Sequence, residues 1–163
     1  MSGSSIRPSW SHDGKWIYYC AWQNSGPQIW KKGAAGGPEI QVTKNGGCNQ
    51  AESRDGVYVY YLKADSRALW RVPAGGGDET EVLALTHGTE FAIGSYGAYL
   101  METVTPAALR YLDFASGGIT VLGMVPGRID ADRGLAVSPD ERWLLYGDTE
   151  LAGSQLMLVE RFR

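Results

Sequence analysis

The side chains that could carry out acid–base or nucleophilic chemistry are few in this chain of 163 residues, which holds two histidines and two cysteines. The run Ser11-His12-Asp13 contains the residue types of a serine-hydrolase triad, but consecutive residues cannot adopt the mutual geometry that a triad needs. The segment Gly94–Gly97 holds a serine near two glycines, yet it lacks the Gly-x-Ser-x-Gly spacing and the strand-turn-helix context of a nucleophile elbow. The sequence therefore predicts no catalytic residue, and we expect a protein that is not an enzyme.

Metal and cofactor sites are not predicted either. Cys20 and Cys48 are accompanied by no paired histidines, so a zinc site would lack its ligands. Asp130 and Asp132 supply two carboxylates, fewer than a calcium loop requires. The two cysteines could form a disulfide or stay reduced, and the sequence leaves both states open. A disulfide would indicate an oxidising compartment.

Composition restricts the class of protein further. Glycine accounts for 22 of 163 residues, roughly 13% against an average of ~7%, while aromatic residues reach 11%. So many large rings exclude a disordered linker, and the glycines lack the three-residue period of collagen. No apolar run is long enough for a membrane helix. A net charge of −3 without a basic cluster argues against direct binding to DNA or RNA. Residues 1–5 lack the basic and apolar regions of a signal peptide.

A repeat of about 41 residues runs through the chain. The motif Ser-x-Asp-Gly, followed by an apolar run, begins at Ser11 and again at Ser53, and a variant begins at Ser138. Three series share this period. The glycine position of the motif gives Gly14, Gly56, Gly97 and Glu141, in steps of 42, 41 and 44. The segments Gln28–Lys31, Ala68–Arg71 and Ala108–Tyr111 step by 40, and the double glycines that begin at Gly36, Gly76 and Gly117 step by 40 and 41.

Each repeat is interpreted as four antiparallel strands. The Ser-x-Asp-Gly step is a turn, in which the side chains cap the backbone and glycine accepts a positive φ. The third strand carries Trp30 or Trp70, and the double-glycine hairpin leads into the fourth. Four strands per repeat of this length are typical of a β-propeller blade, whereas a β-sandwich with fortuitous spacing is the alternative. We predict an all-β chain with about three complete blades and one three-stranded incomplete blade, with boundaries near 6–46, 47–86, 87–127 and 128–163.

The stretch from Pro8 to Ile17, Pro-x-Trp-Ser-x-Asp-Gly-Lys-x-Ile, resembles the WD40-like repeat of the bacterial Tol-B type. The resemblance covers most of the chain, weakly in the third unit, and the Gly-His and Trp-Asp dipeptides of true WD40 repeats are absent. The closing segment Leu156–Arg163 also resembles the end of the propeller in some bacterial winged-helix regulators. The resemblance implies periplasmic protein contact or a sensory domain, and it is compatible with a periplasmic or a cytoplasmic location.

The fourth unit contains three predicted strands, near 135–138, 142–147 and 154–161. The chain ends where a fourth strand should start, and the resulting open sheet edge would offer unpaired backbone groups to another chain. Either the chain is the C-terminal part of a larger propeller, or two copies close into one ring. We expect a homodimer or higher oligomer, joined through the open edge of blade 4 and the N-terminal blade.

Ligand binding is predicted at positions where the repeats differ. Equivalent slots at the start of the innermost strands hold Arg7, Asn49, Glu90 and Gly134, and the slots that line the channel hold Trp10, Glu52, Ile93 and Val137. An unpaired buried carboxylate is costly, so Glu52 would face either water or a polar or cationic ligand. His87 lies in the connection after the second blade and could contact a ligand there. The alternative is that His87 is an ordinary loop residue. The predicted ligand-binding residues at the channel mouth are Arg7, Asn49, Glu52, His87 and Glu90.

The sequence therefore favours a non-catalytic β-propeller module that binds a protein partner or a small polar ligand, without a cofactor. It would serve as the sensory or interaction domain of a bacterial multidomain regulator, or in a Tol-B-like protein. The alternative is the substrate-gating propeller of a prolyl-oligopeptidase-like serine peptidase, whose hydrolase domain would be separate. A structural fragment without activity of its own is a third interpretation. We expect neither a nucleic-acid nor a membrane partner.

Overall fold

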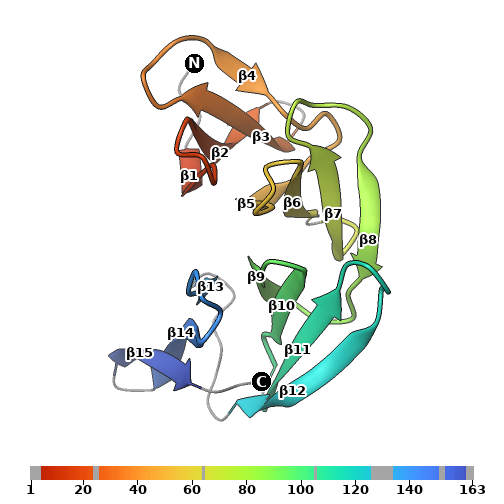
Figure 1. Cartoon of the computed structure of the whole chain (residues 1–163), viewed down its shortest axis with the longest axis vertical. Helices are drawn as coiled ribbons and strands as arrows, with labels where there is room; N and C mark the ends of the chain where they lie inside the picture. Colours follow the sequence, from red (N-terminus) through yellow and green to blue (C-terminus); the bar gives the residue numbers. More distant parts are fainter. Residues whose placement is uncertain are drawn as a thin grey trace. The chain divides into compact units, whose positions relative to one another are not determined.

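The computed structural model describes residues 5–23, 26–63, 65–104, 106–125, 134–150 and 153–160. Within these ranges the strands form four antiparallel sheets, three with four strands and one with three (Figure 1). The predicted all-β fold of three complete blades and one three-stranded blade is confirmed. In the described ranges, no helix has the length and apolar character that a membrane crossing requires.

The strands of each sheet lie side by side in chain order. Blade 1 consists of β1 (Ser5–Trp10), β2 (Trp16–Gln23), β3 (Gly26–Gly33) and β4 (Glu39–Gln41), and blade 2 of β5 (Cys48–Glu52), β6 (Tyr58–Lys63), β7 (Ala68–Pro73) and β8 (Thr80–Ala84). Blade 3 consists of β9 (Thr89–Ile93), β10 (Gly97–Glu102), β11 (Ala107–Asp113) and β12 (Ile119–Val125), and blade 4 of β13 (Leu135–Val137), β14 (Trp143–Glu150) and β15 (Gly153–Glu160). The chain divides into two compact units, an N-terminal unit (Met1–Leu85) with blades 1 and 2 and a C-terminal unit (Thr86–Arg163) with blades 3 and 4.

The Ser-x-Asp-Gly step closes the turn between the first two strands of a blade, as predicted. In blade 1 the Ser11 hydroxyl donates to Asp13 Oδ1 at 2.7 Å, and the Lys15 amide donates to the same oxygen at 3.0 Å. These hydrogen bonds lower the pKa of Asp13 to about 2, and the bond from the Lys15 amide contributes most. Gly14 takes a φ of +70°, which an L side chain rarely adopts. The same bonds between the serine hydroxyl and Asp Oδ1 recur at 2.6 Å in Ser53–Asp55 and Ser138–Asp140.

The innermost strands of blades 1 and 2 share a β-bulge at the slots that the repeat alignment made equivalent. Arg7 and Asn49 have φ values of 54° and 53°, and each lies where the strand register shifts. Gly134, in the corresponding slot before β13, has a φ of 75°. A left-handed conformation costs a non-glycine residue about 1 kcal/mol. Blades 1 and 2 therefore share the bulge, whereas Glu90 in the equivalent slot of blade 3 lies in an uninterrupted register. The sequence did not predict this backbone role of Arg7 and Asn49.

Each unit has its own apolar core between its two blades. In the N-terminal unit the core consists of Tyr18, Ile29, Val42, Val59, Tyr61 and Val72, and Trp16 and Trp70 pack against it. In the C-terminal unit it consists of Tyr99, Met101, Ala107, Leu109, Val125, Leu144 and Tyr146. Trp16 and Trp70, at matched positions of the repeat, are therefore packing residues. Trp10 on β1 and Trp22 on β2 are 63% and 56% exposed and lie outside this core.

Candidate functional site

A cleft of about 350 Å³ lies between blades 1 and 2 of the N-terminal unit. Small-molecule sites usually have volumes of ~300–1,000 Å³, so this cleft could hold a small ligand. Its walls come from the turns after β1 and β5, from β2 and β3, and from the double-glycine turn after β7. The residues that line it are His12, Asp13, Trp16, Tyr18, Lys31, Glu52, Arg54, Asp55, Gly56, Ala74 and Gly75.

Glu52, a residue of the cleft lining, connects blade 2 to blade 1 through hydrogen bonds. Its Oε1 accepts a hydrogen bond from the Tyr18 hydroxyl at 2.6 Å, and its Oε2 accepts one from the His12 amide at 2.7 Å. Burial, followed by this carboxylate, raises the pKa of Tyr18 far above its ordinary value, so the phenol remains a donor. Both oxygens of Glu52 are thus engaged by the protein, a third role beside the water and ligand contacts that the sequence suggested.

The C-terminal unit makes the same connection from a different sequence position. Glu141 accepts hydrogen bonds from the Ser95 amide and from the Tyr99 hydroxyl, each at 2.8 Å. Tyr99 occupies the strand register of Tyr18, and Ser95, like His12, is the second residue after the first strand of its blade. Because this connection recurs in both units, the carboxylate of Glu52 has a structural function.

Lys31 and Arg54 are the cationic side chains of the lining, and the sequence singled out neither of them; Lys31 is the buried one. It lies on β3 and is 8% exposed, and its Nζ donates to the Ala74 carbonyl oxygen at 2.6 Å. The ammonium also lies 4.6 Å from the Trp16 ring centroid and 6.0 Å from that of Tyr18. The repeat alignment could have indicated this residue, because the matching position in blade 2 is also cationic. That residue, Arg71, lies 4.5 Å from the Tyr58 ring centroid.

A second buried lysine in the same unit has a complete set of partners. Lys63 Nζ lies 2.9 Å from Glu79 Oε2 and 3.6 Å from the Trp70 ring centroid. The Tyr61 hydroxyl donates to the same carboxylate at 2.8 Å, and the amides of Lys44 and Asn45 donate to Oε1 at 2.7 and 3.0 Å. Burial raises the pKa of Glu79, but these donors together lower it below its ordinary value. Glu79 is therefore a charged acceptor for four groups.

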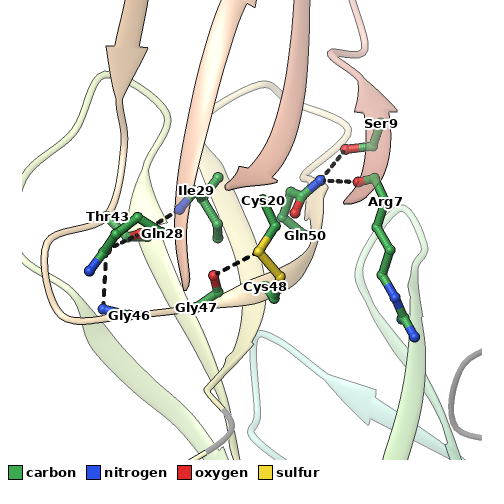
Figure 2. Close-up of a disulfide and its surroundings, with 10 residues drawn as sticks. All are labelled: Arg7, Ser9, Cys20, Gln28, Ile29, Thr43, Gly46, Gly47, Cys48 and Gln50. Carbon is green, nitrogen blue, oxygen red and sulfur yellow. Dashed lines mark hydrogen bonds between the residues drawn. A yellow bond between two sulfur atoms is a disulfide. The ribbon is translucent and has the colours of Figure 1, made fainter. Parts of the chain in front are cut away.

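A disulfide between Cys20 and Cys48 joins β2 of blade 1 to β5 of blade 2 (Figure 2), which answers the question that the sequence left open. The two Cα atoms are 5.2 Å apart. Cys20 Sγ also lies 3.6 Å from the Gly47 carbonyl oxygen, and this is a close contact, because a disulfide sulfur has no proton to donate. Beside the disulfide, Gln50 Nε2 donates to the Arg7 carbonyl oxygen at 2.5 Å (Figure 2). The disulfide and this hydrogen bond connect the two blades covalently and through the backbone.

The predicted binding residues divide between the two units. Arg7, Asn49 and Glu52 belong to the N-terminal unit, and Glu52 lines the cleft. Glu90 is 3% exposed and pairs with Met101 in the β9–β10 ladder, in the C-terminal unit. No single unit therefore contains the whole predicted set.

His87 and the two aspartates that the sequence analysis weighed and rejected as calcium ligands remain to be placed. The His87 side chain is half exposed, and its Nδ1 lies 3.0 Å from Thr86 Oγ1 and 3.8 Å from Glu102 Oε1, which also accepts from Arg110 at 3.1 Å. Asp130 and Asp132 lie outside the described residues. In the ranges that the structure describes, no group of three His, Cys, Asp or Glu side chains could hold a metal ion.

Comparisons with known proteins show a similarity in fold. No protein-family model matches the chain, and no curated protein matches it. Among solved structures, a putative TolB from Agrobacterium tumefaciens is similar, with a TM-score of 0.75 and 19% identity over 98% of this chain and 59% of that one. TolB from Acinetobacter baumannii gives a TM-score of 0.74 and 18% identity over 94% and 40% of the two chains. A prolyl endopeptidase gives a TM-score of 0.61 and 16% identity over 98% and 28%. The chain thus spans less than two thirds of each of these proteins, and it shares the β-propeller fold of TolB-like structures.

Proposed function

We propose that this chain is a non-catalytic binding module and that the cleft between blades 1 and 2 receives a small polar ligand. The observation that carries the proposal is a cleft of about 350 Å³ whose lining includes a buried ammonium group and two aromatic rings. Most of the other side chains in the lining are charged or polar, so the cleft suits a polar ligand, which the two aromatic rings could contact with its apolar part. The fold similarity to TolB, which gives no ligand by itself, is compatible with this role.

The proposal is tested by filling the cleft. Gly75 lies in the lining, has an ordinary φ, and leaves open space around an added Cβ, so Gly75→Phe should obstruct the cleft without strain. Gly123 on β12 has the same properties in the other unit, and Gly123→Phe is the matched control. A library of small polar metabolites would be screened by NMR, with the indole N–H of Trp16 as the reporter. We expect ligands that bind wild type and the control but bind Gly75→Phe at least about tenfold more weakly. Equal binding to all three proteins would refute the site.

We also propose that the chain associates with a second copy through the edge of blade 4. In the described residues, β15 pairs with β14 on one side, and no strand is paired to its other edge. Leu158 on β15 is 57% exposed, and an unpaired edge with apolar side chains favours strand addition. Light scattering should show a species larger than 17.7 kDa, and Leu158→Lys should return it to the monomer. Met124→Lys, at an equally exposed position on β12, should leave the mass unchanged. A monomeric wild-type protein would contradict the proposal.

A second candidate function is the substrate-gating propeller of a serine peptidase. The similarity to a prolyl endopeptidase favours it, although at 16% identity this similarity concerns the fold. The coding sequence on both sides of residues 1–163 would separate the two candidates. A hydrolase domain there favours the gating role, whereas a winged-helix segment or a signal peptide with a further globular domain favours the binding module.

A further inference from the structure

We propose that Lys31 forms an anion subsite of the cleft and that the ligand presents a carboxylate to its ammonium group. This inference rests on the binding role proposed for the cleft and specifies the chemistry of the ligand. A charge that leaves water is costly unless an opposite charge or several hydrogen bonds compensate it. At 8% exposure, Lys31 is nearly removed from solvent, and it is one of the residues that line the cleft.

The two buried lysines of the N-terminal unit provide an internal comparison. Both Lys31 and Lys63 lie over an aromatic ring and are almost fully buried. Lys63 has the carboxylate of Glu79 at 2.9 Å. In the described part of the chain Lys31 forms no ion pair, and its ammonium donates one hydrogen bond, to a carbonyl oxygen. The carboxylate that Lys63 receives from the protein is therefore missing at Lys31, where the cleft provides space for one.

Three acidic residues line the cleft, and within the described part of the chain none of them forms an ion pair with Lys31. Both oxygens of Glu52 accept hydrogen bonds from blade 1. Asp13 accepts from Ser11 and pairs with Lys15 at 3.0 Å through its other oxygen. Asp55 accepts two hydrogen bonds within its own turn through Oδ1. The sequence had suggested that Glu52 would face either water or a polar or cationic ligand. The engaged state of these carboxylates, together with Lys31, favours an anionic group instead.

The test compares carboxylate probes with their neutral isosteres. Succinate represents a free small molecule, and acetyl-Gly-Glu-Gly-amide represents an acidic side chain on a polypeptide. Succinamide and acetyl-Gly-Gln-Gly-amide are the neutral counterparts. Binding would be measured by NMR shifts of the Trp16 indole and of the Lys31 side chain. A hydrogen bond between charged groups should favour a carboxylate probe over its isostere by at least about tenfold, and the probe that binds more tightly identifies the source of the carboxylate.

Three variants make the result specific to Lys31. Lys31→Gln should abolish the preference for carboxylates, and Lys31→Arg should retain it, since the charge is kept. Lys32→Gln changes the neighbouring exposed residue of β3 and should have no effect. A preference that survives in Lys31→Gln, or the absence of any preference in wild type, would overturn the inference. If neutral molecules bind and are lost only in Gly75→Phe, the carboxylate assignment fails while the binding role of the cleft stands.

Discussion

Removing the charge of Glu79 should destabilise the N-terminal unit strongly. Breaking a buried ion pair at one partner costs about 3–5 kcal/mol, because the other charge stays buried. Glu79→Gln leaves the charge of Lys63 buried without its carboxylate. The amide oxygen of the new glutamine can still accept from the Lys44 and Asn45 amides, which in wild type donate to Glu79 Oε1 at 2.7 and 3.0 Å. We therefore expect a loss of about 2–3 kcal/mol in the free energy of unfolding.

Urea denaturation at neutral pH is the assay. With an m-value of about 1–2 kcal/mol/M, the loss should lower the urea concentration at the unfolding midpoint by about 1–3 M. Lys63→Met combined with Glu79→Gln should cost less than the sum of the single changes, by about 1 kcal/mol or more. Glu81→Gln, at an exposed position on β8, is the control and should stay within about 0.5 kcal/mol of wild type. A loss below about 1 kcal/mol for Glu79→Gln, or additive single changes, would refute the proposed coupling.

The same carboxylate predicts a pH dependence whose sign follows from its pKa. The folded-state pKa of Glu79 lies below its ordinary value of 4.5. Its stabilising contribution is therefore present above pH 4.5 and is lost as the pH falls through the folded-state pKa. In Glu79→Gln this part of the acid dependence should disappear, and identical acid unfolding curves for the two proteins would contradict it.

Three further predictions concern the interface between blades 1 and 2. Reduction of the Cys20–Cys48 disulfide, which spans 28 positions, should lower stability by about 3–4 kcal/mol, and calorimetry with and without a reductant, checked by thiol titration, would show it. Gly47→Ala should cost more than about 2 kcal/mol in urea denaturation, because its φ is +132° and an added Cβ would meet the Tyr61 ring; Gly75→Ala, in open space, should be tolerated. Burial and a neighbouring carboxylate keep the pKa of Tyr61 far above 10.0, so stability should fall as the pH rises above 10.0, and a spectrophotometric titration should find this phenol ionised only after unfolding.

The fold was predictable because the repeat contains turn residues that favour a few specific backbone conformations. Asp and Gly in the first turn, and double glycines in the last, specify where strands end, and the equivalence of Arg7 and Asn49 followed from register alone. The candidate site was less predictable, because its groups act across blades. The sequence distinguished Glu52 as unusual, but its partner Tyr18 is 34 positions away, and nothing in either segment specifies the pairing. The environment of Lys31 could not be predicted for the same reason, since its ammonium donates to the carbonyl oxygen of Ala74 in the next blade.

The dependence of blade 1 on groups from blade 2 has a consequence for synthesis. The His12 amide, the Tyr18 hydroxyl and the Cys20 sulfur all find their partners between Cys48 and Glu52. A chain leaving the ribosome at ~5–20 residues per second would expose Cys20 for about 1–6 s before Cys48 follows, 28 positions later. During that interval blade 1 has its turns but lacks the contacts that bury its phenol and its thiol. Blade 1 therefore cannot complete these contacts during translation until β5 of blade 2 has also left the ribosome.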